Sequence, residues 1–455
     1  MNSRIPFFFI LFALLSLILS GFVGILLGFQ NAFPDFIKDI IAFNKLRPLH
    51  VSSSVGWIIL SVTGGIYYYL MNTLKLEIYS KNLLKTHFYI FLIVSIALIY
   101  SLLSGNVGGR EYLSFSPYLM IPILIAWILF AFNFIKTTSS QIKTYPVYIW
   151  MWTTGIIFMI YHLAESNFWL ISSVRQDYIK DFTIQWKSYG SFVGAWNLLV
   201  YGTAIFLMAK VKNDDSYARS KTAFFFYFLG LVNLMLGWAH HTYIVPTEPW
   251  IRYLAYGTSM TEWIIIIKMI HDWKRNLSQE DKTENCLTYR YLMSMEFWVF
   301  INLLLALLIS IPYLNLYTHG THITVAHSMG TTIGINSTIL LASVFYILKR
   351  EFGGDIAKKY PILRFSIKLF NISLAGFFIS LLLLGLHRSD WMINNYNSIP
   401  FGEMFEQSKI YIYPFIASGF GLFISFLITA GIAFKCYIKI LNVSGQSKST
   451  NTETF

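Results

Sequence analysis

The chain has 455 residues, of which 56% are hydrophobic and only 12% are charged. Soluble domains carry roughly 25% charged residues, so this composition excludes a soluble globular protein and indicates that lipid surrounds the chain. The net charge of +12 does not indicate nucleic-acid binding, because the basic residues lie in short loops between apolar segments.

Twelve segments are long and apolar enough to cross a bilayer, which takes about 20 residues as a helix. In chain order they are 5–29, 48–71, 84–104, 118–136, 146–171, 189–210, 222–244, 251–271, 292–313, 319–348, 364–387 and 411–437. We therefore predict an all-α polytopic membrane bundle of about 12 transmembrane helices. Residues 1–443 are expected to form one domain, and residues 444–455, rich in Ser and Thr, a disordered cytoplasmic tail.

The orientation follows from the 34 Lys and Arg residues, most of which fall in loops on the side of the N-terminus. Such an excess marks the cytoplasmic side, so both termini are predicted to be cytoplasmic, in a bacterial inner membrane. Of the ten histidines, only His87 and His271 then fall on the inner side. The others form a layer in the outer part of the membrane. Ionisable residues inside a membrane are usually functional, although interfacial histidines solvated by headgroups are the alternative.

Two neighbouring histidines, His240 and His241, end the seventh segment. Adjacent side chains on a helix project about 100° apart, so two imidazoles can hold one metal from one side. Imidazole suits iron, copper and zinc. The alternative is one core histidine beside an exposed one.

The tenth segment contains His327-Ser-Met329, and the second begins near His50. Positions i and i+2 of a helix lie about 200° apart, so His327 and Met329 can each ligate a haem on opposite faces. His50 is the natural partner for Met329, giving a low-spin haem that transfers electrons. Met329 as an apolar filler is the alternative.

Several motifs resemble the haem-copper oxidase superfamily, and within it the large (cytochrome b) subunit of nitric oxide reductase. They are Arg47-Pro-Leu-His50, Gly237-Trp-Ala-His240-His241, Ser259-Met-Thr-Glu262 and Tyr317-Thr-His319-Gly-Thr-His322-Ile-Thr-Val-Ala-His327. The resemblance covers nearly the whole chain. It implies two haems b, one low-spin and one high-spin, and a non-haem iron, with copper as the alternative metal. It assigns His327 to the high-spin haem, His50 to the low-spin haem, and His240 and His241 to the iron.

The chain departs from this family in the sixth and tenth segments. Met329 stands where the family has a second histidine. The family's His-Leu-Trp-Val-Glu-Gly-x-Trp-Glu stretch aligns with Tyr189-Gly-Ser-Phe-Val193-Gly194-Ala-Trp196-Asn197, so Tyr189 and Val193 replace a metal histidine and a glutamate. Tyr189 is predicted to supply the missing ligand as a phenolate. The pair His162 and Glu165, on one face of the fifth segment, is the alternative. Each position also has a plain structural interpretation: Tyr189 as an interfacial aromatic, Glu165 as an acid paired with Arg175.

Glu262 is predicted to lie near the middle of the membrane, where a carboxyl is a candidate proton donor or a structural hydrogen-bonding group. Arg47 and Arg252, near the outer surface, are candidates to neutralise haem propionates or to anchor the interface.

The leading functional hypothesis is an oxidoreductase that reduces NO to N₂O. Oxygen reduction is the second, although the two positions where oxidases of the superfamily carry a redox tyrosine hold Val193 and Leu234. A non-catalytic haem electron carrier or gas sensor is the third. The chain has no CxxCH motif, so electrons are expected from a cytochrome c-type subunit or a soluble donor on the outer side.

Overall fold

The computed structural model describes residues 4–258 and 263–449. This part of the chain is mostly helical, and its only sheet is a short antiparallel hairpin of β1 (Val107–Arg110) and β2 (Leu113–Phe115). The predicted all-α bundle is therefore confirmed.

Eleven spans in the described residues are long and apolar enough to cross a membrane. They are built from α1 (Ile5–Ala32), α2 (Phe43–Tyr68), α3 (Lys81–Leu103), α4 (Met120–Thr138), α5 (Val147–Glu165), α7 (Tyr178–Lys212), α8 (Lys221–Leu236), α12 (Cys286–Ile309), α14 (His322–Met329) continuing into α15 (Thr338–Phe352), α17 (Ile362–Asp390) and α18 (Phe401–Ser449). The twelfth predicted span, 251–271, corresponds to α9 (Pro249–Thr258) and α10 (Trp263–Arg275), and residues 259–262 lie outside the described part.

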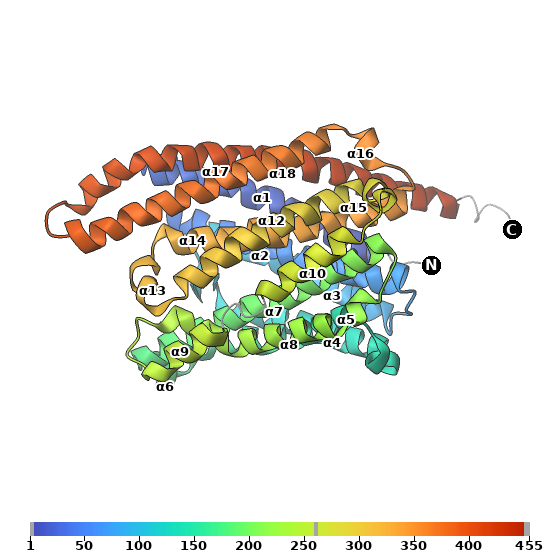
Figure 1. Cartoon of the computed structure of the whole chain (residues 1–455), viewed down its shortest axis with the longest axis horizontal. Coiled ribbons are helices and arrows are strands. Elements are labelled where there is room, and N and C mark those ends of the chain that lie inside the picture. The colour runs from blue at the N-terminus through green and yellow to red at the C-terminus, as the bar shows by residue number, and fades with distance from the viewer. Residues whose placement is uncertain (1–3, 259–262, 450–455) are drawn as a thin grey trace.

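Short helices lie between the spans. They are α6 (Ser172–Arg175), α11 (Gln279–Glu284), α13 (Pro312–Thr318) and α16 (Ile356–Lys359). α6, α9 and α13 lie at the end of the bundle away from the termini, and α16 lies at the end where both termini are found (Figure 1).

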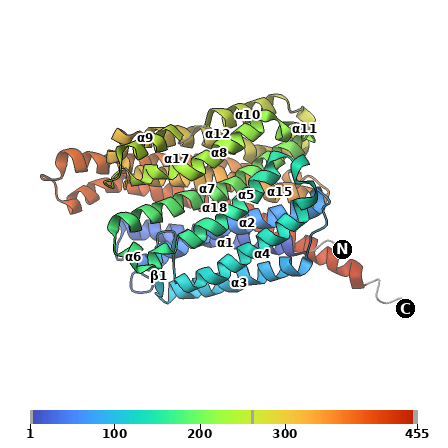
Figure 2. The same cartoon turned by 90° about the horizontal axis from the view of Figure 1, so that it is seen from below.

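Many of the helices pack against the helix that precedes or follows them in the chain. α1 packs against α2 and α18, α17 pairs with α18, and α5 pairs with α7. α3 and α4 lie together along one edge when the bundle is turned (Figure 2). The α7, α14–α15 and α2 spans are the most buried. These central spans carry His50, Tyr189, His327 and Met329, so the fold places this part of the candidate site in the interior.

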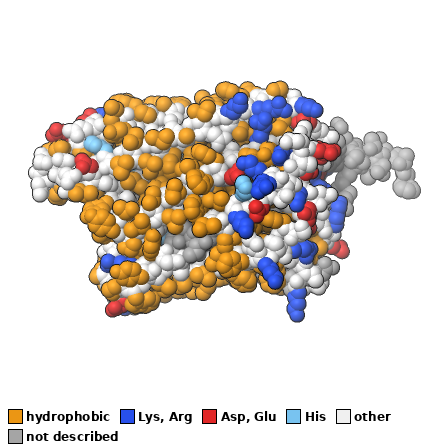
Figure 3. Space-filling model, viewed as in Figure 1, with side chains coloured by type: hydrophobic (Ala, Val, Ile, Leu, Met, Phe, Trp, Pro, Cys, Tyr) orange, Lys and Arg blue, Asp and Glu red, His pale blue; other side chains and the backbone are white. Residues whose placement is uncertain are grey.

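The surface fits a membrane protein with a strong charge asymmetry. Figure 3 shows a broad hydrophobic band, with Lys and Arg gathered mostly at the end of the bundle where the termini lie. The positive-inside rule places the Lys- and Arg-rich end of a membrane protein on the cytoplasmic side. The cytoplasmic position of the termini stays a prediction.

Three helix boundaries differ from those predicted. α8 stops at Leu236, and residues 237–242 form a 3-10 turn, so His240 and His241 do not lie on a regular α-helix. The helix after α13 starts at His322 rather than 319, because Gly320 adopts a left-handed φ of 76° and Thr321 caps the helix. α18 extends to Ser449, so only the end of the predicted tail, 450–455, lies outside the described part and its disorder stays a prediction.

Candidate haem and metal centre

The His240-His241 pair is held against α7 by small residues. A Cβ on Gly190 would lie 2.8 Å from Trp238 Cβ and 3.7 Å from His241 Cδ2, and one on Gly194 would lie 3.0 Å from Leu234 Cγ. Two glycines four residues apart on one helix face allow the close approach of a neighbouring helix. The stretch from α8 to the histidine turn therefore docks closely on α7.

The two imidazoles are neighbours whose ring centroids lie 4.1 Å apart at an interplanar angle of 43°. The Asn315 side chain of α13 donates a 3.4 Å hydrogen bond to the backbone carbonyl of His240. His240 Nδ1 is buried without a hydrogen-bond partner among the described residues. A buried polar atom of this kind fits a nitrogen that binds a group other than protein.

A third imidazole, that of His319, joins this pair. Its ring centroid lies 6.5 Å from that of His241. The Trp186 indole of α7 stacks on His241 at 5.1 Å and meets His319 edge-on at 6.2 Å. Burial lowers the pKa of His319, which favours the neutral ring, whose nitrogen lone pair can bind a metal. Sequence reasoning placed His319 in a motif but gave it no role.

His327 lies on α14 and interacts electrostatically with both His240 and His241. Its Nδ1 atom is also buried without a hydrogen-bond partner in the described part of the chain. Thr331 donates a 3.2 Å hydrogen bond to the carbonyl of His327, and the buried Asn302 of α12 donates to Thr331 at 2.8 Å. His327 therefore lies near enough to the histidine pair to influence it electrostatically, on a helix fixed by α12.

His50 of α2 lies on the α1 side of the bundle. Its Nδ1–H donates a 2.9 Å hydrogen bond to the carbonyl of Ser20, and a Cβ on Gly24 would lie 3.0 Å from His50 Cε1. A backbone acceptor on Nδ1 fixes the tautomer that leaves the Nε2 lone pair free, as in metal-bound histidines. The residue thus fits an axial haem ligand.

Met329 is the last residue of α14 and is half-buried against the hydrophobic core. The segment that follows it, residues 330–337, is a π-helix that packs against α2. Trp57 of α2 donates a 2.9 Å hydrogen bond to Ser337 there. His50 and Met329 are therefore on neighbouring elements, and ligation by Met329 stays a prediction.

Tyr189 does not lie with the histidines. Its ring meets that of Tyr112 edge-on at 5.8 Å, its electrostatic neighbours include Arg110 and Asp181, and its buried hydroxyl has no hydrogen-bond partner among the described residues. Gly190 faces His241 instead. Neighbouring residues of a helix point about 100° apart, so Tyr189 is turned toward the β-hairpin side of α7. The structure does not support Tyr189 as the metal ligand.

His162 and Glu165 form a separate polar cluster. His162 Nδ1 lies 3.0 Å from Glu165 Oε2, and Glu165 also forms an ion pair with Lys187 of α7. The predicted alternative partner of Glu165, Arg175, is replaced by Lys187. His162 Nε2 is buried without a partner in the described residues, and its ring neighbours are Phe158 and Tyr161. These contacts do not join the pair to His240.

Other residues named in the sequence analysis have local partners. Asn336 donates a 3.1 Å hydrogen bond to Asn197, which links α7 to the helix after α14. Arg47 forms a two-pronged ion pair with Glu111, at 2.5 and 3.3 Å, and so ties α2 to the hairpin turn. The Tyr243 hydroxyl donates a hydrogen bond to the backbone carbonyl of Arg252. The Nε atom of Arg252 is buried without a hydrogen-bond partner among the described atoms. Glu262 lies outside the described residues.

The imidazoles of His240, His241, His319 and His327 lie near one another but do not surround a single metal position. Within residues 4–258 and 263–449, no three His, Cys, Asp or Glu side chains form a ready metal-binding group. Imidazoles that share a tetrahedral ion have ring centres about 5 Å apart, given metal–nitrogen distances of about 2 Å. The 6.5 Å between His241 and His319 exceeds this spacing. Metal binding by all three therefore requires a small inward shift of the loop that carries His319.

A family model and several known proteins match this chain. The family model described as cytochrome c and quinol oxidase polypeptide I matches residues 4–423. The B subunit of the nitric oxide reductase of Stutzerimonas stutzeri is 21% identical over 372 residues, which cover 76% of this chain and 74% of that protein.

Two oxidase relatives are similar to a comparable degree. A cytochrome c oxidase subunit 1 homolog of Agrobacterium tumefaciens (strain T37) is 22% identical over 73% of this chain and 64% of that protein. Cytochrome c oxidase subunit 1 of Rhodobacter capsulatus is 21% identical over 73% of this chain and 65% of that protein. A haem-copper terminal oxidase dimer solved by cryo-electron microscopy has the same fold, with a TM-score of 0.70 and 14% identity over 97% of this chain and 84% of that one.

Proposed function

Because the chain belongs to the cytochrome c and quinol oxidase polypeptide I family, whose members are oxidoreductases, we propose that it is the catalytic subunit of a respiratory reductase that converts NO to N₂O. The two relatives named as oxidases are as similar as the one named as a nitric oxide reductase, so the choice of substrate rests on the residues of the site.

The observation that carries the proposal is the gathering of the His240-His241 pair and His319, from two separate segments, beside His327. We assign His327 to a high-spin haem b and the other three imidazoles to a non-haem ion, iron in the first instance and copper as the alternative. The buried, unpartnered nitrogens of His240 and His327 fit this role. In this assignment His319 takes the place of the family histidine that Tyr189 replaces.

His50 and Met329 are assigned to a low-spin haem b. The Ser20 carbonyl holds the His50 ring in place, and the packing of α2 on residues 330–337 sets the distance between the two helices. Methionine ligation raises a haem potential, which favours uptake of electrons from a donor. We propose a cytochrome c-type subunit or soluble carrier, acting at the outer end of the bundle, as that donor.

The positions of the oxidase tyrosine favour NO over O₂. One holds Val193, which packs with the hydrophobic core, and the other holds Leu234, whose Cγ would lie 3.0 Å from a Cβ added to Gly194. Neither side chain can supply the electron and proton that the redox tyrosine gives during O–O cleavage. Reduction of two NO by two electrons and two protons, giving N₂O and water, breaks no O–O bond and does not need that residue.

When bound, the two haems and the ion supply electrons and the sites where the gas binds. The chain's own side chains orient and tune this centre. Trp186 fixes the faces of His241 and His319, and Asn315 fixes the backbone of His240. We propose Glu262, which lies outside the described residues, as the proton donor.

Metal and haem analysis tests the proposal. We expect two haems b and one non-haem iron for each chain in the purified protein, with NO consumed in preference to O₂. Copper together with rapid O₂ consumption would favour the oxidase alternative. Haem without a third metal, and no turnover of either gas, would favour a non-catalytic carrier or sensor.

A further inference from the structure

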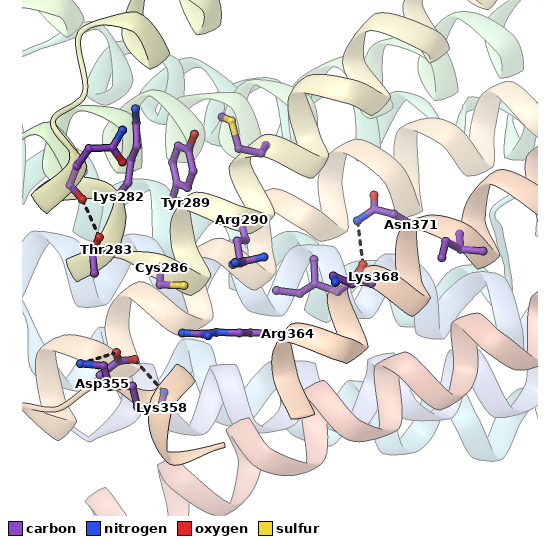
Figure 4. Close-up of a pocket in the computed structure, with 14 residues that line it drawn as sticks. Lys282, Thr283, Cys286, Tyr289, Arg290, Asp355, Lys358, Arg364, Lys368 and Asn371 are labelled. Atoms are coloured by element: carbon purple, nitrogen blue, oxygen red, sulfur yellow. Dashed lines mark hydrogen bonds and ion pairs between the residues drawn. The ribbon is translucent and has the colours of Figure 1, made fainter. Parts of the chain in front are cut away.

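A pocket of about 910 Å³ lies at the end of the bundle where the termini are found, far along the spans from the histidine centre. It is bounded by α11 and α12 on one side and by α16 and α17 on the other. Figure 4 shows Arg290 of α12 and Arg364 and Lys368 of α17 around the same gap, with Lys282 and Lys358 at its rim.

The pocket is strongly basic and its cations are largely unpaired. Its five Lys and Arg side chains face a single carboxylate, that of Asp355. Asp355 is already engaged, because it caps α16 through the backbone N–H groups of Ala357 and Lys358. Lys358 lies 3.9 Å from Asp355 as its ion-pair partner, and among the described residues no carboxylate forms an ion pair with Lys282, Arg290, Arg364 or Lys368. The pocket therefore favours an anion.

Apolar side chains continue from the basic residues along both helices. On α17, Arg364, Lys368 and Ile372 are spaced by four residues, so they share one helix face. On α12, Arg290 is followed on its face by Met293 and Phe297. Ile372 is 72% exposed and Phe297 52% exposed, as expected for side chains that contact lipid. Each helix thus presents charge at the bundle end and apolar surface toward the middle of the membrane.

We propose that this pocket binds the phosphate headgroup of an anionic phospholipid, with the acyl chains lying along Met293 and Ile372. The shared chemistry is that of a phosphate, which a free phosphate ion also has. The apolar continuation of the pocket favours the lipid, because a free ion gains nothing from it. Basic pockets between membrane helices on the cytoplasmic side are suited to such headgroups.

The test is native mass spectrometry of the full chain in neutral detergent, titrated with phosphatidylglycerol, phosphatidylcholine or inorganic phosphate. We expect one tightly bound phosphatidylglycerol and no comparable binding of the other two probes. Each cation near a phosphate contributes about fivefold to affinity, so the Arg364→Gln/Lys368→Gln double variant should bind about 25-fold more weakly. Arg290→Gln alone should bind phosphatidylglycerol about fivefold more weakly. This single variant replaces the double variant in the test if the double variant does not fold.

The matched control is Lys435→Gln/Lys439→Gln. It removes the same charge at the same spacing from exposed positions of α18 outside the pocket, and it should leave binding unchanged. An equal loss of binding in both double variants would overturn the proposal, because general surface charge would then explain it. Phosphate binding as tight as that of phosphatidylglycerol would overturn the assignment to a lipid.

Discussion

Replacing His319 with alanine should remove the non-haem metal while leaving both haems in place. In our assignment His319 is the third protein ligand, and two imidazoles remain without it. Its ring is positioned by Trp186, whose indole also stacks on His241. The substitution therefore deletes a ligand without disturbing the His240-His241 pair, which is held independently by Gly190 and Asn315.

The expected magnitude follows from the loss of a direct ligand. Changes to residues that merely orient a ligand lower metal affinity about 10- to 100-fold. Loss of the ligand itself should lower metal affinity by at least about 100-fold, which corresponds to about 2.8 kcal/mol of binding free energy. After dialysis against a chelator, metal analysis should fall from one non-haem ion per chain toward none, and NO turnover should fall with it. The haem absorption spectrum should be retained.

The neighbouring His322 provides the matched control. It lies three residues farther along and interacts with Arg388, so His322→Ala should keep the metal. Tyr189→Phe should also keep it, because the Tyr189 ring lies against Tyr112. The reasoning is refuted if His319→Ala retains the metal and full turnover. It is equally refuted if Tyr189→Phe loses the metal, which would restore the phenolate ligand predicted from the sequence.

Four further changes test other parts of the site. Met329→Leu should lower the potential of the low-spin haem and alter its spectrum, and an unchanged redox titration would remove Met329 from the ligand set. His327→Ala should abolish the high-spin haem signal alone. Loss of the low-spin signal instead would mean that His327 faces the low-spin haem. Gly190→Ala should lower metal content, because the new Cβ meets the histidine turn at 2.8 Å; Gly431→Ala, which meets nothing within 4 Å, should not. Glu262→Gln should keep both haems and slow turnover at least tenfold in stopped-flow assays, and wild-type rates would leave it a structural role.

Hydropathy was sufficient to predict the fold. A membrane span needs a long apolar run, and that requirement is visible in sequence without knowledge of packing. Eleven predicted spans are found in the described residues. The ends of spans were less predictable, because they depend on local backbone geometry. The left-handed Gly320 and the 3-10 turn at His240 and His241 are examples.

Residue type and sequence position were enough to single out His50, His240, His241 and His327, whose roles as ligands stay predictions. The candidate site was not predictable where a side chain's direction decides its role. Tyr189 occupies the position of the family histidine in the alignment, but the α7 register turns Gly190, not Tyr189, toward the histidine pair. His319 approaches from a loop, and its nearness to His241 depends on how α13 and α14 fold back. A signal was available: His319 lies in the same motif as His327, and neither hydropathy nor periodicity explains a histidine there.

The most direct test of the central proposal is anaerobic turnover of ¹⁵N-labelled NO by the purified, chemically reduced protein, with the product gas identified by mass spectrometry. We expect labelled N₂O, one molecule for every two of NO consumed, at a rate that falls in His327→Ala. Absence of labelled N₂O from protein that carries both haems and the metal, together with reduction of O₂ to water under air, would contradict the assignment of NO as the substrate.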